Sequence, residues 1–188
     1  MQNQIRQQIV ISGVGGQGVL FITRLLAEAA IQKGLPVFTS ETHGMAQRGG
    51  TVLSHLKVGD FSSPLIRPGQ ADGLLALKAE NMAQHAAFLN PDGWAVVNGK
   101  AELSDEYRAR GCVLDADRLA TEIDNPRAVN LIVMGAALSP AAEKRIGRTL
   151  LFCNLAEIKS ALNTRLGNRK KMQADSLTAL NTGFHIRF

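Results

Sequence analysis

A glycine-rich turn at residues 13–18 is the first segment whose residue types could bind a ligand. Its sequence, GVGGQG, has the GxGxxG spacing of phosphate-binding turns and lies between a predicted strand at 8–12 and a predicted helix at 19–33. Glycines let the backbone approach a ligand, and the first amides of the helix favour a phosphate or carboxylate. The glycines could instead serve only close packing of strand on helix. The candidate contacts are Gly13, Gly15, Gly16, Gln17 and Gly18.

Glu41 lies 23 residues after Gly18, about where a nicotinamide-binding fold places the carboxylate that binds a ribose hydroxyl. This spacing leaves open a stand-alone nicotinamide-dependent oxidoreductase as an alternative function. Glu41 could equally be a loop carboxylate with no ligand.

A polar, glycine-containing segment at 40–50 predicts a functional loop. Arg48 could hold a phosphate or carboxylate through two parallel hydrogen bonds, or it could pair with Glu41 and brace the loop. Gly49 and Gly50 would let the backbone come close to a ligand. The remaining candidates for contact with a substrate, a coenzyme or another subunit are His43 and Gln47, and no residue is assigned a catalytic role.

Two further polar residues follow predicted strands. Ser63 precedes Pro64, and we expect this pair to turn the chain toward the face of the 41–50 loop, with the serine hydroxyl available to a ligand or serving only the turn. Asn98 ends a predicted strand, where its amide could hold a ligand or cap local backbone. Three apolar loop residues predict contact with another chain: Met45, Leu65 and Ile66.

The order of elements predicts an α/β class, a Rossmann-like three-layer domain with a mostly parallel sheet and additional C-terminal helices. We predict strands at 8–12, 35–39, 51–58, 71–77, 94–98 and 111–114. We predict helices at 19–33, 79–89, 116–123, 130–138, 154–165 and 171–183. Asp115 could cap the 116–123 helix, and the apolar 130–138 helix, with Gly135 inside it, is expected to be buried closely against the sheet or a partner. Alternation in 51–58 predicts a strand exposed on one face, and 90–93 predicts a turn. The whole chain, 1–188, is expected to form one domain, with a helical extension from about 128 to 188.

Composition argues against several function classes. Cys112 and Cys153 are too few and too far apart for a redox pair or a cysteine-ligated cluster, and the four histidines lack a metal spacing, so we predict no metal site. The net charge of +5 is spread along a chain with few aromatics, which argues against nucleic acid. No apolar run approaches the roughly 20 residues of a membrane span, and residues 1–8 lack the pattern of a secretory signal. We expect a cytoplasmic protein.

One dense cluster of basic residues could be a solvated helix face or a docking patch for an acidic partner. Its members are Arg165, Arg169, Lys170 and Lys171.

The ordered segments together resemble the gamma family of pyruvate and 2-oxoacid:ferredoxin oxidoreductases. The family pattern is GxGGQG, then a glutamate and an RGG loop, then Ser-Pro after an extended strand, and this sequence has each of them in that order. The segments HGMAQRGG and SPLI are most similar to the indolepyruvate branch, the beta subunits of indolepyruvate:ferredoxin oxidoreductases.

This resemblance implies a non-redox subunit, inactive alone, in a complex that oxidatively decarboxylates an aryl-pyruvate or another 2-oxoacid to an acyl-coenzyme A. It implies thiamine pyrophosphate with Mg and 4Fe-4S clusters on large partner subunits, with electrons passed on to ferredoxin. For this chain it implies at most a contact with coenzyme A. A nucleotide-binding scaffold protein is the remaining alternative.

Overall fold

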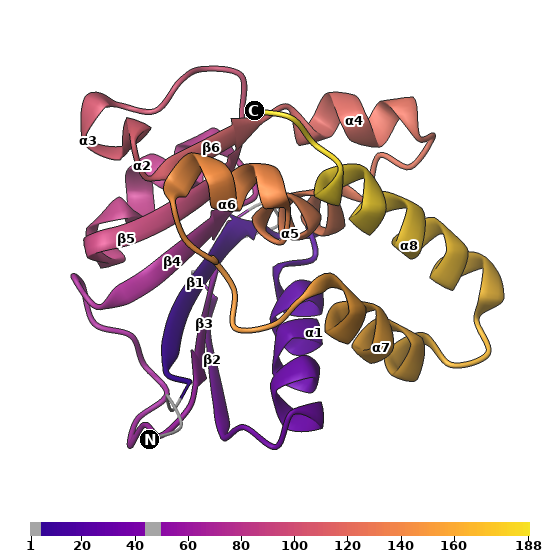
Figure 1. Cartoon of the computed structure of the whole chain (residues 1–188), viewed down its shortest axis with the longest axis horizontal. Helices are drawn as coiled ribbons and strands as arrows, with labels where there is room; N and C mark the ends of the chain where they lie inside the picture. Colours follow the sequence, from indigo (N-terminus) through magenta and orange to yellow (C-terminus); the bar gives the residue numbers. More distant parts are fainter. Residues whose placement is uncertain (1–4, 44–49) are drawn as a thin grey trace.

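A six-stranded sheet forms the middle layer of the computed structural model, which describes residues 5–43 and 50–188 (Figure 1). The strands are β1 (Gln7–Val14), β2 (Val37–His43), β3 (Thr51–Val58), β4 (Ala71–Ala76), β5 (Leu89–Asn98) and β6 (Gly111–Leu114). Their order is β2-β3-β1-β4-β5-β6. The pairs β1-β4, β4-β5 and β5-β6 are parallel, whereas β3 is antiparallel to β1 and to β2. The predicted Rossmann-like, mostly parallel α/β fold is confirmed, with β3 as the reversed strand.

Helices cover both faces of this sheet. They are α1 (Val19–Gln32), α2 (Ala79–His85), α3 (Asp105–Arg108), α4 (Ala116–Glu122), α5 (Val129–Ala137), α6 (Pro140–Ile146), α7 (Leu155–Leu166) and α8 (Lys170–Phe184), with a 3-10 turn at Ala86–Phe88. One core joins the sheet to α1 and α4 through α8. A second core, on the other face, joins the sheet to α2, the 3-10 turn and the segment 59–70. In Figure 1, α7 and α8 lie together beside α1 and α5.

The backbones of α5 and α8 meet at two glycines. A Cβ atom at Gly183 would overlap the carbonyl oxygen of Ile132, and one at Gly135 would overlap that of Leu180. All residues of α5 are buried. The burial predicted for the 130–138 helix is therefore confirmed, and the element that packs on Gly135 is α8 of the same chain.

The strand β3 is buried on both faces, so the prediction of one exposed face is wrong. The polar residues Ser54, His55 and Lys57 are all below 10% exposure. The segment 59–70 covers the face of His55 and Lys57, because Ile66 enters the second core and its backbone amide donates to His55 Nδ1 at 3.4 Å, whereas Ser54 lies on the face of the first core. Ile66 is thus packed within its own domain rather than left for another chain, whereas Leu65 stays 52% exposed.

Several predicted boundaries differ from the structure. The edge strand β2 begins two residues later than predicted and continues to His43, into the segment predicted as a loop. The predicted 79–89 helix ends at His85, and Leu89 instead begins β5, which also contains the predicted turn 90–93. The pairing of β4 with β5 shifts its register there, which accommodates the extra residues.

The short helices α3 and α6 were not predicted, although α6 begins with a recognisable signal. Ser139 caps it by accepting from the backbone amide of Ala142, and Pro140 occupies its first turn. Within residues 5–43 and 50–188, we find no helix with the length and apolar character needed to span a bilayer.

Candidate functional site

The glycine-rich turn lies at the edge of the sheet where the parallel strands end. β1 ends at Val14, and α1 begins at Val19 on the face of the first core. The neighbouring strand β4 is followed by α2, which packs on the opposite face. Where the connections after two adjacent parallel strands run to opposite faces of the sheet, a crevice forms between them, and ligands of α/β proteins bind there.

The glycines of this turn have different roles. A Cβ atom at Gly13 would lie 2.8 Å from Val19 Cγ2, so this glycine allows strand and helix to pack closely. Gly18 has φ of +76° and touches the side chain of Asn130. Gly16 has φ of +91°, and among the described residues no atom of another segment lies within 4 Å of a Cβ built on it. Packing therefore explains Gly13 and Gly18, while Gly16 leaves the backbone accessible to a ligand.

Gln17 turns its side chain toward the protein. Its Oε1 atom accepts from the backbone amide of Val14 at 2.9 Å, and its Nε2 atom donates to the carbonyl of Leu77 at 3.3 Å. These bonds tie the turn to the end of β4. Gln17 therefore shapes the turn, and its amide is used within the described structure.

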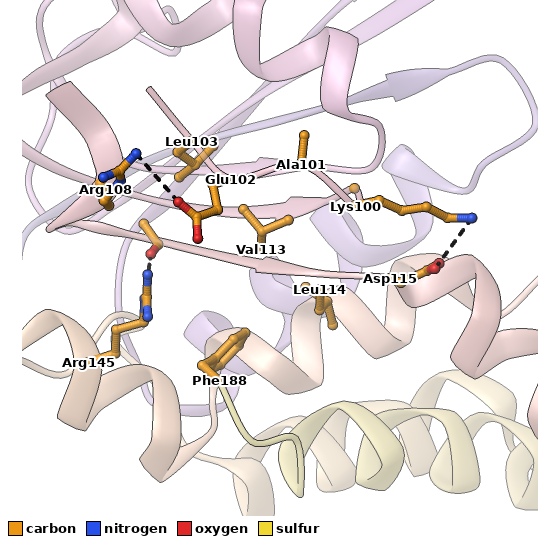
Figure 2. A pocket seen from close by; sticks show the side chains of 12 residues that line it. Lys100, Ala101, Glu102, Leu103, Arg108, Val113, Leu114, Asp115, Arg145 and Phe188 are labelled. Atoms are coloured by element: carbon orange, nitrogen blue, oxygen red, sulfur yellow. Dashed lines mark hydrogen bonds and ion pairs between the residues drawn. The ribbon is translucent and has the colours of Figure 1, made fainter. Parts of the chain in front are cut away.

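A cavity of about 520 Å³ runs along the edge strand β6 (Figure 2). Its charged side chains are paired with protein groups: Lys100 with Asp115 at 3.6 Å and Arg108 with Glu102 at 3.4 Å. Arg145 donates from Nε to the carbonyl of Gly111 at 3.0 Å. The charges of Lys100 and Arg108 are thus compensated by carboxylates of the same cavity, and Arg145 is held by a backbone carbonyl.

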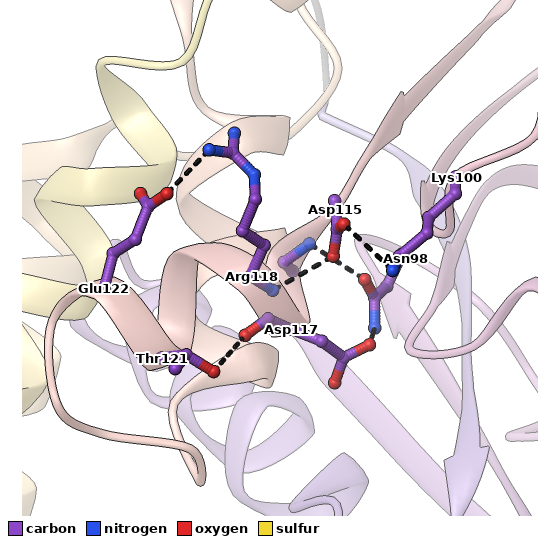
Figure 3. A network of polar contacts seen from close by, with 8 residues as sticks. Asn98, Lys100, Asp115, Asp117, Arg118, Thr121 and Glu122 are labelled. Atoms are coloured by element: carbon purple, nitrogen blue, oxygen red, sulfur yellow. Dashed lines mark hydrogen bonds and ion pairs between the residues drawn. The ribbon is translucent and has the colours of Figure 1, made fainter.

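Asn98 ends β5, the strand between β4 and β6, and is nearly fully buried. Figure 3 shows it beside Asp117 at the start of α4. The Oδ1 atom of Asn98 accepts from the amide of Ala116 at 2.9 Å. Its Nδ2 atom donates to the carbonyl of Leu77 at 3.1 Å and to Asp117 Oδ2 at 2.8 Å. Of the two roles expected for Asn98, the structure contains the backbone cap, which joins the ends of β4 and β5 to the start of α4.

The first turn of α4 also contains the predicted cap. Asp115 accepts from the backbone amide of Arg118 at 3.0 Å, which confirms the expectation that Asp115 caps this helix (Figure 3).

The two ends of the predicted 41–50 loop reach the same edge of the sheet. Glu41 belongs to β2, opposite Ser54 of β3, and is half-buried. At the other end, the amide of Gly15 donates to the carbonyl of Gly50 at 3.0 Å. Met45, Gln47, Arg48 and Gly49 lie outside the described residues, as does the side chain of His43. The loop is therefore anchored directly on the glycine-rich turn.

Ser63 is placed at the opposite end of the sheet. It lines a cavity together with Gln8, at the amino end of β1. The segment is held there because the amide of Gly59 donates to the carbonyl of Pro36, just before β2 begins. The expectation that Ser63 and Pro64 turn the chain toward the 41–50 loop is thus wrong, and a ligand contact of Ser63 stays a prediction.

A cavity of about 740 Å³ adjoins the glycine-rich turn and was not predicted. Asn130, at the start of α5, borders it and donates to the carbonyl of Gly18 at 3.2 Å. Its basic lining residues are Arg127, Arg169, Lys170 and Lys171, with Asp175 as the one carboxylate of the lining. In the sequence this site was visible only as a cluster of basic residues. No local pattern predicted that the start of α8 would line the same cavity as Asn130, which contacts Gly18.

The titratable groups of the two cores are held in their neutral forms. Burial raises the pKa of Cys112 to about 11 and that of Cys153 to about 12, so both remain thiols at neutral pH. Burial also lowers the pKa of His85, whose Nδ1 atom lies 2.9 Å from Ser12 Oγ. Over the described ranges, His, Cys, Asp and Glu side chains do not gather in groups of three that could hold a metal ion.

Residues 8–186 match the family described as pyruvate ferredoxin/flavodoxin oxidoreductase. A similar curated protein, indolepyruvate oxidoreductase subunit IorB of Archaeoglobus fulgidus, is 47% identical over 94 residues, which are 50% of this chain and 47% of that protein. The chain thus matches about half the length of this relative. IorB of Pyrococcus horikoshii is 29% identical over 150 residues, covering 68% of this chain and 74% of that protein.

Solved structures with the same fold have lower identity. The keto/oxoacid ferredoxin oxidoreductase gamma subunit of Geobacter sulfurreducens has a TM-score of 0.72 and 23% identity, covering 95% of this chain and 96% of that one. A 2-oxoglutarate:ferredoxin oxidoreductase of Magnetococcus marinus, solved with 2-oxoglutarate, coenzyme A and succinyl-CoA, has a TM-score of 0.74 and 20% identity, covering 97% of this chain and 31% of that one. Together with the family match, the shared fold confirms the resemblance seen in the sequence: the chain belongs to the pyruvate ferredoxin/flavodoxin oxidoreductase family.

Proposed function

We propose that this chain is the non-redox, gamma-type subunit of a thiamine-pyrophosphate-dependent 2-oxoacid:ferredoxin oxidoreductase. The observation that carries the proposal is the family match over residues 8–186, together with curated relatives named as indolepyruvate oxidoreductase subunits. Those names favour indolepyruvate or another aryl-pyruvate as the substrate. The reaction would be oxidative decarboxylation to an acyl-coenzyme A.

The residues of this chain do not fit an iron-sulfur cluster. A 4Fe-4S cluster takes four thiolate ligands, whereas the sequence has two cysteines, and both are buried thiols with raised pKa values. Cys112 lies in β6 and Cys153 before α7, on separate elements. This supports assigning the clusters, and with them thiamine pyrophosphate and Mg, to larger partner chains that reduce ferredoxin.

The charge of the basic cavity beside the glycine-rich turn supports coenzyme A as its ligand. The phosphates of coenzyme A are anionic, and the cavity offers cationic side chains from Arg127 and from the start of α8 at 169–171. The volume of about 740 Å³ is large enough for part of a nucleotide. Asn130 joins this cavity to the glycine-rich turn, because it lines the cavity and donates to the carbonyl of Gly18. We propose that this edge contacts coenzyme A, with Arg48 binding an anionic group or bracing the loop.

The strand order argues against the nicotinamide alternative. In the dinucleotide-binding fold the acidic residue ends the strand next to β1. Here β3 lies between β1 and β2, so Glu41 is one strand farther from the glycine-rich turn than the acidic residue of that fold. Neighbouring strands are about 5 Å apart. Titration of the chain with NADH, followed by fluorescence, is expected to show no binding at millimolar ligand.

Reconstitution tests the proposal. The chain is co-expressed with a large chain that carries thiamine-pyrophosphate and cluster motifs, and reduction of ferredoxin is measured with indolepyruvate and coenzyme A. We expect the two chains to purify together and turnover to require both. A stable monomer that neither binds the large chain nor changes its activity would contradict the proposal, and ligand binding without any such dependence would indicate a scaffold protein.

A loop variant tests the site within that assembly. Arg48→Ala is expected to lower 2-oxoacid oxidation while leaving the complex intact, since the guanidinium would either bind an anion or position the loop. Arg24→Ala, on the exposed face of α1, is the matched control. Normal turnover of the Arg48 variant would remove the loop from the proposed site.

A further inference from the structure

A second basic cavity lies at the opposite end of the sheet from the glycine-rich turn. It has a volume of about 460 Å³ and is enclosed by the amino end of β1, the end of β3 and the segment 59–70. Its charged lining residues are Arg6, Lys57 and Arg67, and no aspartate or glutamate is among the described residues that line it. The described lining therefore has three formal positive charges and no carboxylate.

Lys57 is the unusual member of this group, because it is only 7% exposed. It lies on β3 and pairs there with Gln8 and Phe38, but within the described ranges its ammonium has no hydrogen bond or ion pair. Its polar contact is with an aromatic ring, since Nζ lies 5.0 Å from the centre of the Phe61 ring. Buried lysines are rare unless they are paired, so an ammonium lining a cavity without an anion is incompletely compensated.

Arg6 and Arg67 increase the excess of positive charge around Lys57. Arg6 also lies over the Phe61 ring, with Cζ 4.4 Å from its centre, so two cations share one aromatic side chain. Burial lowers the pKa of Lys57, and the charges of Arg6 and Arg67 lower it further. Lys57 lines the cavity, so a small solute that enters the cavity can contact the ammonium.

The nearby acid Asp72 has other partners. Its carboxylate accepts from the backbone amide of Gln8 at 2.7 Å and from Asn90 Nδ2 at 2.9 Å. It therefore fastens β1 to β4 and the start of β5, and it does not line the cavity. This differs from the cavity along β6, where Lys100 and Arg108 each have a carboxylate partner.

We propose that this cavity binds the phosphate group of a small molecule. Lys57 would be the buried ligand, Arg6 and Arg67 would contact the same group from the rim, and the hydroxyls of Ser62 and Ser63 would donate to its oxygens. A phosphate dianion matches three cations better than a single carboxylate does. The proposal does not rest on the function of the opposite edge, because none of the residues involved reaches it.

Calorimetric titration of the full chain with inorganic phosphate at constant ionic strength tests this site. We expect saturable binding with a stoichiometry of one at this cavity, weakened about 10-fold or more in Lys57→Met, since a charge-assisted hydrogen bond is lost. Arg67→Gln should weaken it as well. Arg24→Gln on α1 removes an exposed arginine elsewhere and should bind as the wild type does.

Two further measurements keep the result unambiguous. Phosphate should raise the melting temperature of the wild type more than that of Lys57→Met, and a cooperative melting transition of the variant would show that it is folded. Lys170→Met alters the basic cavity beside the glycine-rich turn and should leave the Lys57 site unchanged. Equal binding by Lys57→Met, loss of binding only in Lys170→Met, or no binding at tens of millimolar phosphate would each overturn the proposal.

Discussion

Gly18 is the position in the glycine-rich turn where the structure predicts the largest effect of a single methyl group. Its backbone has φ of +76° and ψ of 30°, in the left-handed region. An alanine in this conformation costs about 1–2 kcal/mol relative to glycine. A Cβ atom would in addition overlap the amide nitrogen of Asn130. Gly18→Ala therefore carries two separable costs.

The second cost comes from moving Asn130. Its Nδ2 atom donates to the carbonyl of Gly18 at 3.2 Å, and the side chain is mostly buried. Displacing it breaks this bond and leaves a buried polar group without its partner, which costs about 1–3 kcal/mol. The sum is about 2–5 kcal/mol. For a chain of this length it corresponds to a fall in melting temperature of about 4–20 °C.

Urea unfolding of matched variants separates the two costs. Gly16→Ala has the same kind of backbone cost, because φ is +91°, but its Cβ meets open space, so we expect only about 1–2 kcal/mol. In an Asn130→Ala background, the cost of Gly18→Ala should fall to a similar value. Equal losses for Gly16→Ala and Gly18→Ala, or an undiminished cost in the Asn130→Ala background, would refute the role given to Asn130.

Three further predictions concern the core. Gly183→Ala should lower the free energy of unfolding, measured in urea, by about 1–3 kcal/mol, because its Cβ would overlap a carbonyl of α5. The control Thr182→Ala, on the same helix, should be nearly neutral. Similar values for the two variants would contradict the close contact of α5 with α8. Cys112 and Cys153 should resist iodoacetamide at pH 8 and react after unfolding in urea, and rapid alkylation of the native chain would contradict their burial. Burial lowers the pKa of His55 in the folded chain below its ordinary 6.5, so its contribution to stability is complete above pH 6.5 and is lost as pH falls through the folded-state value. The free energy of unfolding should therefore fall less between pH 7 and pH 5 in His55→Gln than in the wild type, and equal falls would show that this histidine is not responsible.

The local parts of the fold could be predicted because their signals are local. The turn at 13–18 combines glycine spacing with a β-branched strand before it and a helical period after it, and each is visible within a few residues. Asp115 was recognisable as a helix cap for the same reason. The burial of β3 was not visible, because it depends on Ile66 and the segment 59–70 folding back over the strand.

The roles of the site residues depend on contacts that a sequence does not contain. Gln17 and Asn98 have side chains suited to a ligand, yet both donate to the carbonyl of Leu77, which is distant from each of them in the chain. The basic cluster at 165–171 gave no sign that part of it borders the glycine-rich turn. That neighbourhood is created by the packing of α8 on α5 through Gly183, a long-range contact of two backbones.

The two ends of the sheet differ in how their polar side chains are used, and this difference predicts how variants will behave. At the carboxyl edge, Gln17, Asn98 and Asn130 donate to backbone carbonyls, so their removal should lower stability before it reveals any effect on a ligand. At the amino edge, the ammonium of Lys57 has no such bond among the described residues. Replacing Lys57 removes its repulsion with Arg6 and Arg67 and breaks no hydrogen bond of the side chain. Lys57→Met should therefore retain or increase stability, whereas Asn98→Ala should reduce it by about 1–3 kcal/mol. Loss of phosphate binding in Lys57→Met would therefore be more direct evidence of a ligand site than loss of binding in Asn98→Ala, because only the second variant is also expected to lose stability.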